Sequence, residues 1–140
     1  MTPLQPNYER GDAVRVALPD QIRRAIFAHA ADCAPDECCG LLAADDKGRI
    51  TFAYPLTNVD PSPVSYTVDP DEHFQALRHS ESRGWEIAGV FHSHPRGPAV
   101  PSMIDVQNAL EPEWVYLVVA PDEMRGFRIR DGKIEEVGLE

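Results

Sequence analysis

The chain has 140 residues, 43% of them hydrophobic, and this length and composition fit one globular domain with its own core. Its 13 basic and 23 acidic side chains give a formal net charge of −10, which repels phosphate backbones and argues against a nucleic-acid partner. No apolar run reaches the roughly 18 residues of a membrane helix, and the N-terminal residues lack a secretory signal, so we expect a cytoplasmic protein with no membrane partner.

The first half of the chain predicts a lead-in, a helix and a strand. Residues 1–12 are expected to form the lead-in, and residues 13–140 a single folded domain. Residues 20–33 place apolar side chains at helical spacing, and Pro35 ends this helix because proline disfavours helical backbone in the preceding residue. The apolar run at residues 38–44 is too short for a helix and predicts a buried strand.

A hairpin, a loop and a second helix are expected next. The turn residues 45–48 lead into a hairpin partner at residues 49–56. Residues 57–70 contain three prolines and predict an ordered loop, with a small edge strand at residues 64–68. Residues 71–83 carry apolar side chains at helical spacing and end at a glycine, which is typical of a helix C-terminus.

The C-terminal half is rich in strands. Residues 86–94 predict one strand, and the β-branched run at residues 114–120 predicts a central one. Asp131-Gly132 lies between two further apolar stretches and is a strong signal for a two-residue hairpin. Strands that alternate with helices predict an α/β fold: a single domain with one mixed sheet flanked by about three helices.

Three cysteines, Cys33, Cys38 and Cys39, do not form a disulfide pattern, because their number is odd and two of them are adjacent. They also lack the second pair of ligands that a zinc knuckle needs. We therefore expect small buried side chains in a reducing compartment, which agrees with a cytoplasmic location.

The chemically informative residues follow the strand at residues 86–94. His92 and His94 are two residues apart, so both imidazoles lie on one face of the strand, whereas Ser93 points to the opposite face and is rejected as a nucleophile. Ser102 and Asp105 have the spacing of a helix capping box. A carboxylate in a first helical turn can also point at an ion held by the strand, and such a three-ligand set leaves one tetrahedral position open, as in catalytic zinc sites. On spacing alone, a helix start beside a surface histidine pair stays the alternative.

The order His-Ser-His-Pro at residues 92–95, followed by Pro-Ser-x-x-Asp at residues 101–105, resembles the signature of the JAMM metalloproteases, also called MPN-plus domains. Upstream, Pro-Asp-Glu-Cys-Cys-Gly-Leu-Leu at residues 35–42 is similar to the Pro-x-Glu-x-Cys-Gly-Leu-Leu setting of that family. The resemblance extends over about residues 14–137, essentially the whole domain. It implies a zinc peptidase or isopeptidase with an MPN-like sandwich fold, similar to that of cytidine deaminases.

The resemblance also implies a role for each matching residue. His92, His94 and Asp105 match the ligands of one zinc ion per chain. Glu37 matches the acid that takes a proton from the attacking water, and Ser102 matches the serine that helps to stabilise the tetrahedral oxyanion. Without the resemblance, Glu37 would be read as an exposed acid after a helix, and Ser102 as a helix cap alone.

The resemblance to one group within the family implies a substrate class. It lacks the long insertions of eukaryotic deubiquitinating members and resembles the compact prokaryotic members of Mec type, to which residues 57–74 are also similar. This implies hydrolysis of the bond after the C-terminal Gly-Gly of a small ubiquitin-like or sulfur-carrier protein, with release of cysteine or another C-terminal extension. The sequence leaves open the identity of the carrier, the choice between peptide and isopeptide bonds, and the oligomeric state.

Three alternative classes share some of these features. A non-catalytic MPN scaffold would only bind partners, but such proteins have lost ligand positions that this chain retains. RadC-like proteins associated with DNA repair show a similar pattern of histidines and aspartate, but they carry a helical DNA-binding region for which 140 residues leave no room. Zinc deaminases need a Pro-Cys-x-x-Cys element, which this sequence lacks.

Overall fold

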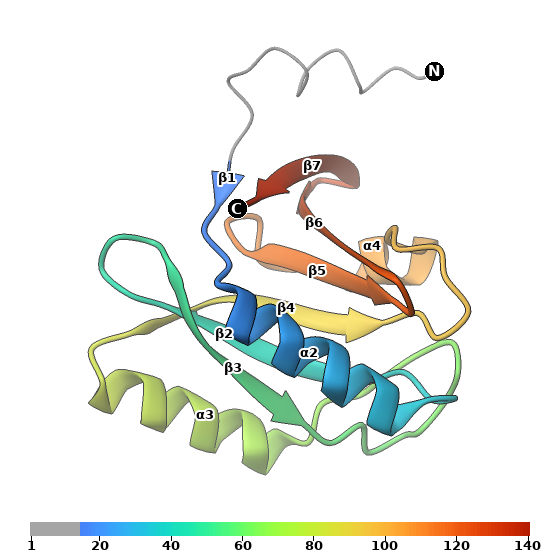
Figure 1. Cartoon of the computed structure of the whole chain (residues 1–140), viewed down its shortest axis with the longest axis horizontal. Helices are drawn as coiled ribbons and strands as arrows, with labels where there is room; N and C mark the ends of the chain where they lie inside the picture. The colour runs from blue at the N-terminus through green and yellow to red at the C-terminus, as the bar shows by residue number, and fades with distance from the viewer. Residues whose placement is uncertain (1–14) are drawn as a thin grey trace.

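The computed structural model describes residues 15–140, so the expected lead-in at residues 1–12 lies outside the described residues. Seven strands form one mixed sheet in the order β1-β7-β6-β5-β4-β2-β3 (Figure 1). The strands are β1 (Arg15–Val16), β2 (Cys39–Ala44), β3 (Ile50–Leu56), β4 (Glu86–Ser93), β5 (Val115–Ala120), β6 (Glu123–Arg130) and β7 (Lys133–Leu139). Two neighbouring pairs, β1 with β7 and β4 with β5, are parallel, and the other pairs are antiparallel. The predicted α/β class with a mixed sheet is confirmed.

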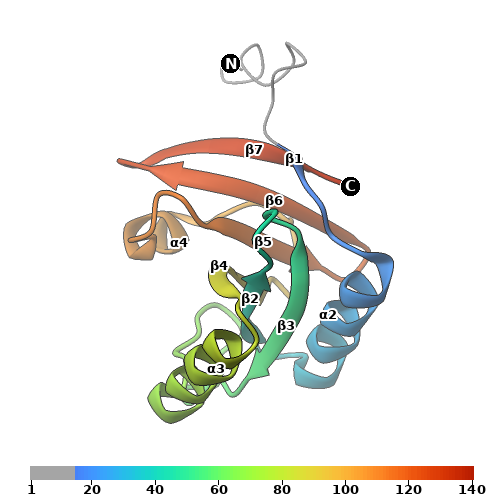
Figure 2. The same ribbon diagram turned by 90° about the vertical axis from the view of Figure 1, so that its left-hand side faces the viewer.

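Three helices cover the sheet in the described part of the chain: α2 (Asp20–Cys33), α3 (Pro70–Ser82) and α4 (Met103–Asn108). Figure 2 shows α2 on one face of the sheet, and α3 and α4 on the other. The start of α3 follows from its sequence, because Pro70 suits a first helical turn and the Asp69 carboxylate accepts hydrogen bonds from the N–H groups of Asp71 and Glu72. The expected number of helices is confirmed within residues 15–140.

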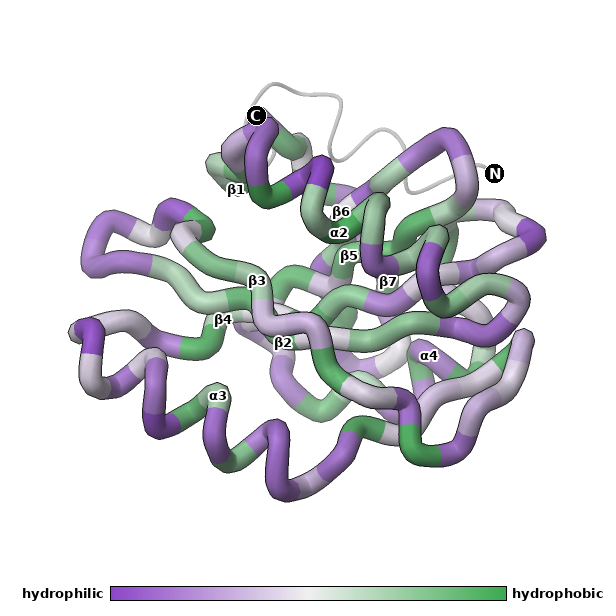
Figure 3. The backbone as a smooth tube through the Cα atoms, turned by 60° about the horizontal axis from the view of Figure 1, so that its bottom comes forward, coloured by the Kyte–Doolittle hydropathy of each residue, from purple (hydrophilic) through white to green (hydrophobic). Residues whose placement is uncertain are grey.

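The hydrophobic core has two halves, one on each side of the sheet. Ile26 of α2 packs into the first half together with Phe91 and Leu117, and Ala76 of α3 packs into the second with Val90 and Val118. Strands β2 and β5 are buried along their whole length, which explains why both read as continuous apolar runs. In Figure 3 the hydrophobic residues gather in the central strands, whereas α3 carries hydrophilic residues along much of its length.

Two turn predictions had different outcomes. The Asp131-Gly132 hairpin is confirmed, with φ of 50° and 78°, the positive values that a two-residue turn between twisted strands requires. The edge strand expected at residues 64–68 is wrong: the structure has only an isolated bridge between Asn58 and Val68. The side chain of Asn58 makes hydrogen bonds along this loop in place of a strand ladder.

The sheet fixes where the histidine pair lies. His92 is paired with Cys39 of β2 on one side and Val118 of β5 on the other, and the N–H of His94 continues the pairing by donating to Val119 O at 2.8 Å. Strands β4 and β5 run parallel, so the two imidazoles lie at a carboxyl edge of parallel strands, where α/β proteins commonly place their binding sites.

Cys38 and Cys39 are fully buried, as expected from the sequence, and Cys33 is partly buried.

No helix among residues 15–140 has the length and apolar character needed to cross a membrane.

Candidate metal centre

Three side chains converge beyond the end of β4. The Nε2 atoms of His92 and His94 are 3.1 Å apart, and Asp105 Oδ2 lies 3.0 Å from the first and 3.1 Å from the second. Strand alternation brings the two imidazoles to the face of the sheet that α4 covers, and Asp105 reaches them from the first turn of that helix. This is the only group of three or more potential metal ligands that the described residues bring within reach of one ion.

The first turn of α4 holds the carboxylate in place. Ser102 Oγ accepts a hydrogen bond from Asp105 N at 3.1 Å, and Ser102 N donates to Asp105 Oδ2 at 2.8 Å, so the capping box predicted from the sequence is confirmed. Asp105 therefore serves the helix and the cluster with the same oxygen atom. The Ser102 hydroxyl keeps its own proton available for another acceptor, because Oγ acts only as an acceptor in the cap.

A hydrogen bond to the backbone orients His94. Its Nδ1 lies 2.8 Å from Pro98 O, which can only accept, so Nδ1 carries the proton. In the neutral ring the Nε2 lone pair then faces the cluster, the arrangement that metal-binding histidines commonly share. The hydrogen bond between His94 and Asp105 raises the pKa of His94 above its ordinary value, although burial opposes this shift and the Pro98 carbonyl adds to it.

The surroundings of Asp105 strongly favour its ionised, negatively charged form. Burial alone would raise the pKa of this carboxyl, but hydrogen bonds from His92 and His94 and from the N–H of Ser102 hold it well below its usual range. A carboxylate oxygen and two imidazole lone pairs at about 3.1 Å from one another would repel unless a proton or a cation lies between them. The three donor atoms are thus arranged so that they could hold a cation, either a proton or a metal ion.

Glu37 lies near the cluster on the loop between α2 and β2. The residue is only 3% exposed, and its Oε1 atom is buried without a hydrogen-bond partner in the described part of the chain. Burial raises the pKa of Glu37 to about 7; the nearby charge of His94 opposes the shift and that of Asp105 adds to it. A buried carboxyl that titrates near neutrality is suited to accept and return a proton.

The loop after β3 fixes the backbone of Glu37. Glu37 N donates to Ser62 O at 2.8 Å, and Asn58 Nδ2 donates to Glu37 O at 3.1 Å. Asn58 also donates to Ser65 O, and its Oδ1 accepts from the N–H groups of Asp60 and Thr67. One asparagine side chain therefore shapes this loop and ties it to the residue that carries the buried carboxyl.

The same loop supports the histidine pair. Tyr66 stacks on His92 with ring centroids 5.0 Å apart and an angle of 26° between the planes. His92 itself is 2% exposed, so the stack holds its ring between the loop and the sheet. Sequence reasoning missed both Asn58 and Tyr66 as residues of the site. The turn-forming preference of asparagine within a proline-rich stretch was the available signal.

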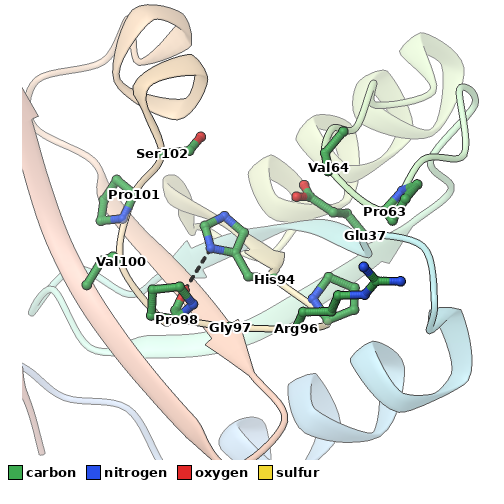
Figure 4. A pocket seen from close by; sticks show the side chains of 11 residues that line it. Glu37, Pro63, Val64, His94, Arg96, Gly97, Pro98, Val100, Pro101 and Ser102 are labelled. Atoms are coloured by element: carbon green, nitrogen blue, oxygen red, sulfur yellow. Dashed lines mark hydrogen bonds between the residues drawn. The ribbon is translucent and has the colours of Figure 1, made fainter.

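A cleft opens beside the cluster. It has a volume of about 440 Å³, and its lining combines Glu37, His94 and Ser102 with Arg96 and with apolar residues, mostly prolines (Figure 4). In Figure 4 Glu37 and Ser102 face each other across the cleft, with the His94 ring between them. Ser93 lies apart from this arrangement: it is buried, and its Oγ accepts a hydrogen bond from Cys38 N. The structure therefore brings together all five residues singled out from the sequence.

Comparison with known proteins assigns the class. Residues 19–130 match the family described as prokaryotic homologs of the JAB domain, and the chain belongs to this family. The fold agrees, since a JAB1/MPN domain protein from Archaeoglobus fulgidus superposes with a TM-score of 0.59 over 90% of this chain and 98% of that one, at 17% identity. A solved protein from Desulfitobacterium hafniense is more similar, with 32% identity and a TM-score of 0.80 over 89% and 91% of the two chains.

Several named relatives are similar to this chain along most of their length. A desampylase of Haloferax volcanii is 40% identical over 77% of this chain and 82% of its own. A CysO-cysteine peptidase of Mycobacterium tuberculosis is 32% identical over 91% of both chains. A probable TtuB-protein conjugate cleaving protease of Thermus thermophilus is 36% identical over 87% of this chain and 80% of its own.

Proposed function

We propose that this protein is a zinc-dependent peptidase that hydrolyses the bond after the C-terminal Gly-Gly of a small ubiquitin-like or sulfur-carrier protein. The observation that carries the proposal is the convergence of His92, His94 and Asp105 beside a cleft that also contains Glu37. Membership of the JAB-domain family supports the reaction class. The names of the relatives, which describe desampylation, CysO-cysteine hydrolysis and conjugate cleavage, support the class of substrate.

The donor set fits a zinc ion. Ligands at about 2.0–2.1 Å from a tetrahedral ion are separated from one another by about 3.3–3.4 Å, and the three donor atoms here are separated by 3.0–3.1 Å. Two imidazoles and a carboxylate are ligands that zinc accepts, and a set of three leaves a position open for the reaction. In this proposal His92, His94 and Asp105 hold one zinc ion per chain. When bound, zinc lowers the pKa of water and polarises the scissile carbonyl.

Glu37 is the proton carrier in this proposal. Its carboxylate accepts a proton from the attacking water and returns it to the leaving amine, which needs a pKa near the working pH. The burial that raises its pKa to about 7 supplies this property. Ser62 and Asn58 hold both backbone groups of Glu37, so the backbone from which the carboxylate projects is fixed during the transfer.

Ser102 is the oxyanion donor. Its hydroxyl faces the cleft from the side opposite Glu37 (Figure 4), and its proton is not used by the helix cap. A donor fixed by a cap is oriented before the substrate arrives, so it can stabilise developing negative charge without reorganisation. Hydrolysis needs no covalent enzyme intermediate, which agrees with the buried position of Ser93.

The cleft suits a narrow, flexible tail. Its walls are built mostly from prolines, with Val64 and Val100, and its volume of about 440 Å³ accommodates a few small residues and not a folded domain. Glycines bring the least bulk to such a space, and an extended tail can place its scissile carbonyl between Glu37 and Ser102.

The test is a cleavage assay on carriers that end in Gly-Gly followed by an added residue. We expect release of the added residue by the zinc-loaded protein, loss of activity with a chelator, and recovery when zinc is restored. Zinc content and cleavage should both fall in His92→Ala, whereas Glu37→Gln should lose cleavage and keep zinc. Bound zinc without cleavage of any carrier would contradict the proposed substrate. Absence of bound zinc would favour a non-catalytic MPN scaffold, and salt-sensitive DNA binding would favour a RadC-like role.

A further inference from the structure

The cleft contains a positively charged side chain, that of Arg96, which has no role in the proposed hydrolysis. Arg96 is exposed and lines the cleft together with Glu37 and His94. Among the residues that line this cleft, its side chain alone carries a permanent positive charge. Within the described part of the chain, no carboxylate lies at ion-pair distance from its guanidinium. In a protein with a net charge of −10, an unpaired arginine inside a binding cleft is available for an anionic ligand.

The backbone of Arg96 is well fixed. Gly97 N donates to His94 O at 2.7 Å, so residues 94–97 form a tight turn immediately after the histidine. Gly97 has a φ of 65°, which glycine adopts without strain, and the loop returns to the core through the fully buried Ala99. The guanidinium therefore projects from a rigid turn, and its distance from the reacting centre is limited by the length of one side chain.

The position of Arg96 indicates which part of a substrate it meets. Figure 4 shows Arg96 beside Glu37 and Pro63, on the side of the cleft away from Ser102. A group that returns a proton to the leaving amine must lie next to that amine, so the Glu37 side of the cleft receives the leaving group. Ser102, on the other side, faces the carbonyl oxygen. Arg96 therefore lies on the leaving-group side.

From this arrangement, and on the basis of the proposed peptidase function, we propose that Arg96 binds the free α-carboxylate of the residue that is released. A single amino acid added after Gly-Gly has this carboxylate one residue beyond the scissile bond, within the small cleft. An isopeptide-linked lysine inside a protein chain has no carboxylate there. Arg96 thus makes the enzyme selective for short C-terminal extensions over internal isopeptide conjugates.

The electrostatic surroundings agree with this assignment. Glu37 lines the same cleft, and its carboxylate form would repel a substrate carboxylate on this side of the cleft unless a positively charged side chain lay beside it. A planar guanidinium can bind a carboxylate through two parallel hydrogen bonds, which a lysine ammonium cannot reproduce. A charge-assisted bond of this kind at a partly exposed site corresponds to about a tenfold preference or more.

The test uses three matched substrates on one carrier. The first carries a single alanine after Gly-Gly, the second carries the same residue as its carboxamide, and the third carries an isopeptide-linked lysine peptide with blocked ends. We expect the wild type to prefer the free acid over the amide by about tenfold or more in kcat/KM. In Arg96→Ala this ratio should fall to near one, and Arg96→Lys should give an intermediate value. Arg24→Ala, which removes the same charge from an exposed position of α2, should keep the ratio of the wild type.

A second measurement is independent of cleavage. Metal-free Glu37→Gln protein is titrated with acetyl-Gly-Gly-Ala and with its C-terminal amide, and amide chemical shifts report binding. The acid should bind more tightly, and Arg96→Ala should remove the difference. Equal rates and equal binding for acid and amide in the wild type would overturn the proposal for Arg96. So would a loss in Arg96→Ala of the same size for all three substrates, which would indicate contact with the body of the carrier. Failure of every carrier to be cleaved would refute the proposed function, and the binding data would still decide on Arg96.

Discussion

The buried carboxyl of Glu37 predicts a measurable dependence of stability on pH in the metal-free protein. The pKa of this group is raised from 4.5 to about 7 in the folded state, chiefly by burial. Between these values the folded protein retains a proton that the unfolded chain has already released, so the free energy of unfolding falls as the pH rises. At about 1.4 kcal/mol per pH unit, the full shift corresponds to about 3 kcal/mol.

The comparison is best made between pH 5 and pH 6.5. The raised pKa of His94 contributes stability that is lost mainly as the pH rises above this interval. The lowered pKa of Asp105 contributes stability that is lost only as the pH falls below it. Over this interval the titration of Glu37 should lower the free energy of unfolding of the wild type by about 2 kcal/mol. Glu37→Gln replaces the carboxyl with a neutral group of similar shape, so this loss should disappear.

Urea denaturation at the two pH values, with a chelator present, measures the effect. The wild type should lose about 2 kcal/mol more than Glu37→Gln on going from pH 5 to pH 6.5. Glu81→Gln, at an exposed position of α3, serves as the matched control and should follow the wild type. If wild type and Glu37→Gln show the same change with pH, Glu37 is not the desolvated carboxyl that the mechanism requires.

Three further predictions concern the surroundings of the site. Asn58→Asp replaces the donor that faces Glu37 O and Ser65 O with an acceptor. We expect kcat to fall by about tenfold or more with zinc content retained. An unchanged kcat would show that this contact does not position Glu37. Ser102→Ala should cost about 1 kcal/mol in urea denaturation through loss of the cap, and lower kcat by about a hundredfold through loss of the oxyanion donor; a loss of stability alone would restrict Ser102 to capping. Gly89→Ala would place a methyl group against the backbone carbonyl of Val115. The free energy of unfolding should therefore fall by about 3 kcal/mol in urea denaturation. A variant as stable as the wild type would contradict the close approach of β4 and β5.

Much of the fold and the site could be predicted because the signals are local. Strand alternation placed His92 and His94 on one face, and the capping-box spacing placed Asp105 in the first turn of α4, where it meets them. The position of Glu37 could not be obtained from local spacing. It depends on the pairing of β2 with β4 across more than 50 residues of sequence, and only the family resemblance indicated it.

The loop after β3 was the least predictable part. A small edge strand was expected at residues 64–68 within this proline-rich loop, but the side chain of Asn58 occupies backbone groups that a strand would use. The stacking of Tyr66 on His92 and the place of Arg96 in the cleft depend on how distant segments meet. Nothing in the spacing of these residues indicates such long-range contacts.

Zinc K-edge X-ray absorption, combined with metal analysis of the wild type and His92→Ala, tests the central claim most directly. If His92, His94 and Asp105 hold the metal, the spectrum and the metal analysis should show one zinc ion per chain, with nitrogen and oxygen neighbours at about 2.0–2.1 Å, imidazole scattering and no sulfur. The same measurement on His92→Ala should show zinc lost or sharply reduced. A sulfur neighbour at about 2.3 Å would place the metal on the cysteines instead. Such a result, or full zinc content in His92→Ala, would contradict a metal centre at the end of β4.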